Sequence, residues 1–233
     1  IIACAGINTP AAITAAILLI IFHAISKALL FLCVGAIEQK IGSRDIEDMR
    51  GLYARMPRTA IITIIGVLTM MLPPFGMLMA KWMAIESAQG QFLVMIMLAL
   101  GSGLTVLFWC RWAGILLISP FGKPQPETQA CSVRLPLVIL AAMAVLVSLV
   151  SPFVYNGLVA PVVAMYYKAT AYAVSYGNLE SASGVFIVYP LFILLGLGFY
   201  YAVRQSRKVT AAQVSAPYMC GEQETVDGKP GFL

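Results

Sequence analysis

The sequence predicts an all-α membrane protein, a multi-span helical bundle in which one transmembrane helix is broken by prolines. The composition points to this class, because the chain is 61% hydrophobic and only 11% charged, whereas soluble domains carry about 25% charged residues. The apolar residues also lie in runs of about 20, the length that a helix needs to cross a membrane. One run, from Thr59 to Glu86, contains Pro73, Pro74 and Gly76 near its middle, and these residues predict the helix break.

We expect five crossings separated by polar loops. In chain order they lie at about 10–37, 59–88, 92–118, 135–154 and 185–203. The residues before Asn8 resemble the end of an earlier span. The stretch Pro161–Tyr176 is apolar but contains Lys168 and several tyrosines, which is more typical of a segment at the membrane interface than of a crossing.

Basic residues predict the orientation. The loop 38–58 has five of them, the loop 119–134 has two, the tail 204–233 has four, and the opposite loops have only Lys168. By the positive-inside rule, both loops and the C-terminal tail are cytoplasmic. The assignment requires that 59–88 crosses once and that 161–176 does not cross.

The same composition excludes several function classes. The net charge of +5 comes from loop residues, so we expect an anionic membrane surface beside them and no nucleic acid. The five cysteines contain no C-x-x-C pair and the chain has one histidine, so no metal site or redox centre is expected on this chain. We also find no nucleotide-binding glycine motif and no nucleophile elbow, and therefore expect no cofactor and no catalytic residue.

Lys81 is the first charged residue in the run from Thr59. A lysine at membrane depth is costly and usually faces a protein interior or a water-filled cavity. Pro73 and Pro74 lack an N–H, so the carbonyls of Thr69 and Met70 lose their helical donors and need a protein-lined or wet site. Broken helices of this kind form mid-membrane ion sites in transporters. The alternative is a simple proline kink with Lys81 reaching toward the membrane edge.

His23 and Lys27 lie four residues apart in the first span, and therefore on one helix face. Burial disfavours the charged form of both side chains, and a desolvated lysine can exchange protons near neutral pH. The pair is thus a candidate proton relay. Alternatively, His23 makes a structural hydrogen bond and Lys27 reaches the cytoplasmic edge, although Lys27 lies about ten residues before the end of its span.

Two further charged residues are possible members of the path. Glu86 follows Lys81 by five residues, so the two point to different faces, and Glu86 could simply be solvated near the outer end of its span. Arg111 lies between Trp109 and Trp112, which favours an interfacial anchor over a relay.

The first half of the chain resembles a known family. The segments HAISKALLFLCVGAIEQKIGSRDIEDMRGLYARMP and TAIITIIGVLTMMLPPFGMLMAKW are similar to the antiporter-like membrane subunits of respiratory complex I, Mrp-type cation/proton antiporters and membrane-bound hydrogenases. The resemblance covers about Ile1–Arg111. Within the family, LPPFGMLMAKW is most similar to the large membrane subunit of energy-converting (Ech-type) nickel–iron hydrogenases, and the tail APYMCGE resembles a short Pro-Tyr-x-Cys-Gly motif of related small subunits.

The resemblance implies a domain organisation. Each family member has two inverted five-helix repeats with one broken helix in each. Residues 1–118 would form part of the second repeat, 119–203 would add C-terminal transmembrane helices, and 204–233 would be the polar tail. His23 and Lys27 would lie on the hydrophilic axis, and Lys81 would be the titratable residue of the second broken helix. The chain begins with Ile1 inside an apolar stretch, so we expect it to be the C-terminal part of a longer protein.

The resemblance also implies a function. The chain would translocate an ion, a proton or Na+, as a subunit of a redox-driven oxidoreductase complex, here a ferredoxin-linked hydrogenase. Its partners would be other membrane subunits, a peripheral hydrogenase and iron–sulfur arm, and the lipid bilayer of a prokaryotic plasma membrane. The alternatives are a complex I-type quinone oxidoreductase, an Mrp-type Na+/H+ antiporter, or a passive scaffold of a membrane arm.

Overall fold

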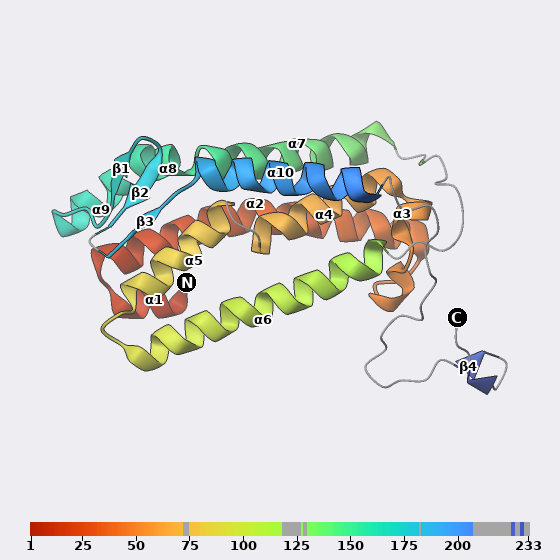
Figure 1. Cartoon of the computed structure of the whole chain (residues 1–233), viewed down its shortest axis with the longest axis horizontal. Coiled ribbons are helices and arrows are strands. Elements are labelled where there is room, and N and C mark those ends of the chain that lie inside the picture. The colour runs from red at the N-terminus through yellow and green to blue at the C-terminus, as the bar shows by residue number, and fades with distance from the viewer. Residues whose placement is uncertain are drawn as a thin grey trace. The chain divides into compact units, whose positions relative to one another are not determined.

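The computed structural model describes a helical protein in two units (Figure 1). The described residues are 1–71, 75–117, 127, 130–181, 183–206, 225–226 and 229–230. The units are Ile1–Ile193 and Leu194–Leu233. The second unit contains the later part of α10 (Tyr189–Ser206) and an antiparallel pair of short strands, β4 (Thr225–Val226) and β5 (Lys229–Pro230).

The first unit consists of helices and one small sheet. The helices of its first half are α1 (Ile2–Ile7), α2 (Pro10–Ile41), η1 (Glu47–Met49), α3 (Leu52–Arg55), α4 (Pro57–Met71), α5 (Gly76–Ser87) and α6 (Phe92–Leu117). The elements that follow are α7 (Cys131–Leu149), α8 (Ser151–Val154), η2 (Tyr155–Val159), α9 (Ala160–Tyr167), β1 (Ala173–Ser175), β2 (Asn178–Glu180) and β3 (Val185–Phe186).

The prediction of an all-α membrane protein is confirmed. Within the described residues, four helical segments are long and apolar enough to cross a membrane: α2, α4 with α5, α6 and α7. They correspond to the first four expected crossings, although α7 begins at Cys131, four residues before the expected start. The apolar part of α10, Tyr189–Tyr201, is shorter than these four.

The expected fifth span was placed too early in the chain. Val185 and Phe186 form strand β3, which pairs with Leu179 and Glu180 of β2, so α10 begins only at Tyr189. Pro190 lies in the first turn of α10, where its missing N–H costs nothing. The first two residues of this apolar run therefore pair in a sheet, and a count of apolar residues does not distinguish such a strand from the start of a helix.

The stretch Pro161–Tyr176, interpreted as interfacial, contains the end of α9 and part of a β-hairpin, and no membrane-length helix among its residues. β1 pairs antiparallel with β2 from Ala173↔Glu180 to Ser175↔Asn178. The two residues of the turn, Tyr176 and Gly177, both have left-handed φ angles of 49° and 79°, as two-residue hairpin turns require.

Helix α2 is the centre of the first unit, and α4, α5 and α7 pack against it (Figure 1). Its start is specified by Thr9, whose side chain accepts a hydrogen bond from the Ala12 N–H at 3.2 Å, followed by Pro10. It ends at Gly42, which has a left-handed φ of 82° of the kind that commonly terminates helices.

Two glycines bring the broken helix against α2. A Cβ atom on Gly66 of α4 would lie 2.8 Å from Leu30 Cδ2, and one on Gly76, the first residue of α5, would lie 2.1 Å from Phe22 Cε1. Leu30 and Phe22 are both buried side chains of α2. Helices α4 and α5 therefore reach their observed distance from α2 because Gly66 and Gly76 have no Cβ atom.

The residues that were predicted to break the helix lie partly outside the described part. Pro73 and Pro74 are outside it, while Gly76 begins α5. The last residue of α4 is Met71, so the two helices end and begin on either side of the predicted break.

The first turn of α4 is bound by a distant carboxylate. The backbone N–H groups of Arg58 and Thr59 donate to Glu127 Oε2 at 2.9 and 3.2 Å, and the Thr59 hydroxyl donates to Oε1. The first N–H groups of a helix have no partner within the helix, and an anion there is also favoured by the helix dipole. Glu127 thus performs the role of an N-cap from nearly 70 residues away in the sequence.

We expect Gly76→Ala to destabilise the protein, because the new methyl group overlaps the Phe22 ring. Overpacking of this kind costs about 1–3 kcal/mol. Thermal unfolding of the purified complex checks this, with Gly101→Ala in α6 as the control, since a Cβ there meets nothing within 4 Å. Adding Phe22→Leu to Gly76→Ala should recover part of the loss. Equal stability of Gly76→Ala and Gly101→Ala would contradict the close approach.

We expect Glu127→Gln to loosen the first turn of α4 by about 1 kcal/mol, since losing a cap of this kind costs about that much. Hydrogen exchange in the purified complex should rise several-fold at Arg58 and Thr59. The control is Glu38→Gln, because Glu38 makes an exposed ion pair with Arg44 and exposed pairs contribute little. Unchanged exchange in Glu127→Gln would show that the carboxylate does not hold this turn.

Candidate ion-transfer site

The ammonium group of Lys81 lies at the carbonyl end of α4. Lys81 is in the second turn of α5, and its Nζ donates to the Met70 carbonyl oxygen at 3.4 Å. Met70 is four residues before Pro74, so this carbonyl is one that lacks its usual helical donor. The C-terminal end of a helix also carries a partial negative charge. The half-buried Lys81 ammonium therefore lies at a carbonyl oxygen that needs a hydrogen-bond donor, at a helix end that favours positive charge.

Helix α2 contributes two polar groups to this region. Ser26 is buried, and its hydroxyl lies 3.0 Å from the hydroxyl of Thr69 on α4. The Thr69 hydroxyl also lies 2.7 Å from the Gly66 carbonyl oxygen. Thr69 precedes Met70, so this contact joins α2 to the last turn of α4 directly beside the carbonyl that binds Lys81.

His23 and Lys27 lie on the same helix as Ser26, and both are half-buried. Lys27 and Lys81 both act electrostatically on His23, so the three basic side chains share one region. The Lys27 ammonium lies 5.2 Å from the centre of the Trp109 ring on α6, within the range of a cation–π interaction. A cavity of about 150 Å³ adjoins this contact and is lined by Lys27, Leu30, Phe31, Val34, Trp109 and Trp112.

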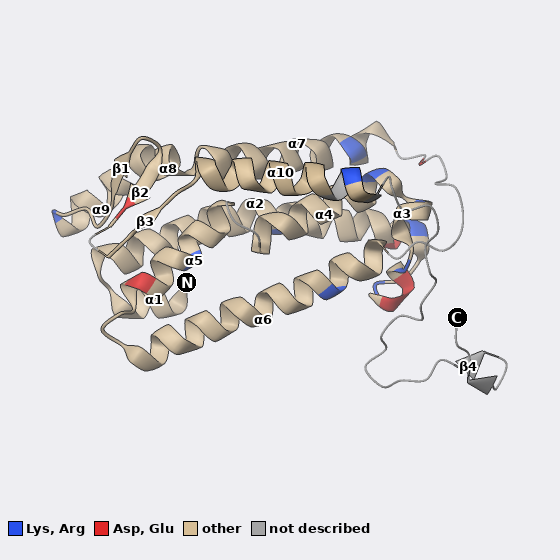
Figure 2. Cartoon of the chain, in the orientation of Figure 1, with Lys and Arg blue, Asp and Glu red and all other residues tan. Residues whose placement is uncertain are grey.

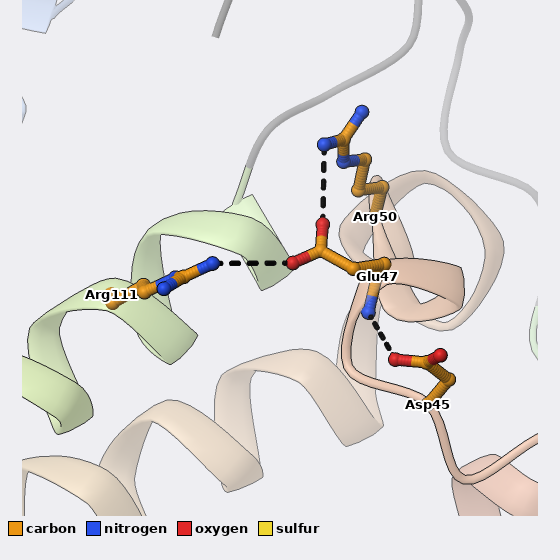
Figure 3. Close-up of polar contacts among 4 residues, drawn as sticks. All are labelled: Asp45, Glu47, Arg50 and Arg111. Carbon is orange, nitrogen blue, oxygen red and sulfur yellow. Dashed lines mark hydrogen bonds and ion pairs between the residues drawn. The ribbon is translucent and has the colours of Figure 1, made fainter. Parts of the chain in front are cut away.

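Arg111 lies apart from these residues. Its Nη2 pairs with Glu47 Oε1 at 3.4 Å, and Glu47 Oε2 pairs with Arg50 at 3.1 Å (Figure 3). The backbone N–H of Glu47 also donates to Asp45. The Arg111 side chain is 66% exposed, so its position fits an anchor between α6 and the loop at 42–51 better than a relay.

Glu86 also lies apart, at the last turn of α5. The hydroxyls of Ser181 and Ser183, which lie between β2 and β3, both donate to its Oε1. The arrangement therefore brings together His23, Lys27 and Lys81 among the sequence candidates, and it separates Arg111 and Glu86 from them.

Sequence reasoning missed Ser26, Thr69 and Trp109 as neighbours of the candidate residues. Ser26 directly precedes Lys27, and Thr69 is four residues before Pro73, so both could have been suspected as polar groups near the break. Trp109 gave no such signal, because a tryptophan near a span end is usually interfacial.

Three comparisons with known proteins show what this chain is similar to. Residues 1–107 match the family described as "NADH:quinone oxidoreductase/Mrp antiporter, TM". Hydrogenase-4 component B of Escherichia coli (strain K12) is 32% identical over 143 residues, which cover 54% of this chain and 21% of that protein. The Na(+)/H(+) antiporter subunit A1 of Staphylococcus aureus (strain JH9) is 27% identical over 225 residues, 86% of this chain and 28% of that protein.

A solved structure shares the fold. It is titled "Structure of the membrane-bound sulfane sulfur reductase (MBS), an archaeal respiratory membrane complex", and the match has a TM-score of 0.70 and 22% identity over 92% of this chain and 36% of that one. This chain thus spans from about a fifth to just over a third of the length of these relatives. Over residues 1–107, a little under half of its length, the chain is therefore similar to the membrane subunits of NADH:quinone oxidoreductases and Mrp antiporters.

Proposed function

We propose that this chain moves protons across the membrane as a subunit of a redox-driven, energy-converting complex of the hydrogenase type. The observation that carries the proposal is the contact of Lys81 Nζ with the Met70 carbonyl at 3.4 Å, at the broken middle of a membrane-length helix. A lysine at membrane depth is energetically unfavourable, and a helix with only a structural role gains nothing from one. The similarity to hydrogenase-4 component B supports the type of complex.

Lys81 is the residue that would hold and release the proton. When it is protonated, the carbonyl end of α4 stabilises the ammonium group through the helix dipole. When a second positive charge arrives within about 6 Å, the ammonium is destabilised by about 3 kcal/mol at an effective dielectric constant of 20. The proton then leaves, and the neutral amine can accept the next one.

His23 and Lys27 would bring that second charge. Both are on α2, which packs against α5, and Lys27 and Lys81 both act on His23 electrostatically. Trp109 gives the Lys27 ammonium a favourable site 5.2 Å from its ring centre. Trp109 would therefore hold the Lys27 side chain on the α6 side, and His23 would link it to Lys81.

The proposed orientation puts the loop at 42–58 and the C-terminus in the cytoplasm. In the first unit, Lys and Arg gather where α2 ends and α3 and α4 begin (Figure 2), and the positive-inside rule favours the cytoplasm for such a cluster. The proposed partners are other membrane subunits and a peripheral hydrogenase and iron–sulfur arm, where electron transfer would occur. The membrane would be a prokaryotic plasma membrane.

A second candidate function is Na+/H+ exchange without a redox partner. The similarity to the antiporter subunit A1 extends over 86% of this chain, further than the similarity to the hydrogenase component. This candidate requires that vesicles with the purified complex exchange Na+ for protons without an electron donor. The redox-driven proposal requires that transport starts only when reduced ferredoxin is supplied, and a complex I-type assembly would need a quinone in addition.

We expect Lys81→Ala to reduce proton translocation at least tenfold in vesicles containing the whole complex and driven by reduced ferredoxin. A positioned proton-transfer group commonly contributes about 10²–10⁴-fold. Lys81→Arg should fail as well, although it keeps the positive charge, because arginine stays protonated in proteins. Assembly and electron transfer should persist in both variants.

The matched control for Lys81 is Lys40→Ala, which removes a lysine from the last turn of α2 and should pump as wild type. Unchanged pumping by Lys81→Ala would refute its role and favour a passive scaffold. Pumping by Lys81→Arg at the wild-type rate would mean that the charge alone matters and that no proton leaves this residue.

A further inference from the structure

A cavity of about 600 Å³ lies between α2, the loop at 42–51 and the second half of α6. Its volume is in the range of small-molecule sites, about 300–1,000 Å³. Two cations and two anions line the end beside the loop: Arg44, Asp45, Glu47 and Arg111. These four charges sum to zero, so the lining is complementary to a ligand that itself carries one charge of each sign.

The charged side chains have hydrogen-bonding capacity to spare. Arg111 makes one contact among the described residues, with Glu47 at 3.4 Å (Figure 3), and Arg44 donates from Nε to Glu38 at 2.7 Å. A guanidinium group carries several more N–H donors, which match the oxygens of a phosphate. The Arg44 and Arg111 side chains are 79% and 66% exposed, so a ligand can reach both. Asp45 accepts the Glu47 N–H through Oδ1, and its other oxygen can accept a donor from a ligand.

Away from the loop the lining is apolar. It consists of Val34, Ile46, Met49, Phe108, Trp109 and Trp112. Val34 and the two tryptophans also line the cavity of about 150 Å³ beside Lys27. We call the two adjoining cavities together the α2–α6 groove. Lys27 precedes Val34 by seven residues on α2, so the groove extends about 10 Å further along that helix.

The order of side chains along the groove follows the depth profile of one membrane leaflet. Helices α2 and α6 are both long and apolar enough to cross a membrane. Charged groups belong at the membrane surface, tryptophans at the level of the lipid headgroups, and aliphatic side chains beside the acyl chains. The surface of α6 is also largely exposed among the described residues. An apolar helix would fit the inner part of the groove but not its charged end, whereas an amphiphile fits both.

We propose that the α2–α6 groove binds a zwitterionic phospholipid with a primary ammonium headgroup, of the phosphatidylethanolamine class. The phosphate would lie against Arg44 and Arg111, and the ammonium against Asp45 and Glu47. One acyl chain would lie along the tryptophans and Val34 and cover Lys27 on the α6 side. Binding of this lipid does not depend on ion transfer at Lys81.

The test is photolabelling of the whole complex in vesicles that contain a phosphatidylethanolamine with a diazirine in one acyl chain. Mass spectrometry of the labelled peptides should find label at 30–34 and 108–112. Excess unlabelled phosphatidylethanolamine should remove this label more effectively than the same amount of phosphatidylglycerol or phosphatidylcholine. Bulk lipid is monitored on α7, which exposes Val138, Ile139, Met143 and Leu146, and all three lipids should dilute that label equally.

We expect the double variant Arg44→Gln and Arg111→Gln to lower the groove label about fivefold, since each exposed charge contact contributes modestly. The double variant Asp45→Asn and Glu47→Gln should instead make phosphatidylglycerol the better competitor, because cations alone then remain at the charged end. A disturbed loop would not reverse the headgroup preference in this way. The matched control is Arg134→Gln, which removes an exposed arginine of α7 that does not line the groove and should label as wild type.

Three outcomes would overturn the lipid site. Equal competition by the three lipids would mean that bulk lipid enters the groove without headgroup recognition. Label on α7 but none at 30–34 or 108–112 would mean that another part of the complex occupies the groove. An unchanged headgroup preference in the Asp45→Asn, Glu47→Gln variant would mean that these carboxylates do not bind the ammonium group.

Discussion

The carbonyl end of α4 meets the ammonium group of Lys81, and the surrounding structure is arranged to permit this contact. A proline four residues after Met70 removes the donor that its carbonyl would have, and Lys81 supplies another at 3.4 Å. Each group is unfavourable alone in an apolar environment, the carbonyl because it lacks a donor and the lysine because it is charged. Together they offset part of each other's cost, which makes a broken helix tolerable at membrane depth.

Close packing on α2 keeps the two half-helices in register. Gly66 and Gly76 let α4 and α5 approach Leu30 and Phe22, and the hydroxyls of Ser26 and Thr69 join α2 to the last turn of α4. The far end of α4 is bound by Glu127. A short helix thus has an anion at its N-terminus and a cation at its C-terminus, the arrangement that the helix dipole favours.

Two charged groups outside this centre are held by other side chains. Arg111 pairs with Glu47 on the side of the loop at 42–51, and Glu86 is bound by two serines near the opposite end of α5. The basic residues in the middle, His23, Lys27 and Lys81, have no carboxylate partner among the described contacts. Repulsion between them is therefore not cancelled by a carboxylate among the described residues, and under the proposed function it would favour release of a proton.

The sequence by itself determined the membrane class, the approximate positions of the four long spans and the group of residues at the break. Each of these follows from local properties: apolar run length, missing N–H groups at proline, and the cost of a lone lysine. The family resemblance then related His23, Lys27 and Lys81 to one path. The sequence did not distinguish the strand at 185–186 from the start of a helix, because both are short apolar runs.

Only the tertiary structure decided which groups meet across long separations. Four such contacts join residues that lie 64 to 97 positions apart: Glu127 with the start of α4, Glu47 with Arg111, Lys27 with Trp109, and Glu86 with the serines beyond β2. No local propensity encodes such contacts, since they depend on how whole helices pack. The sequence specified which groups needed partners, and the packing of α4, α5 and α6 around α2 chose them.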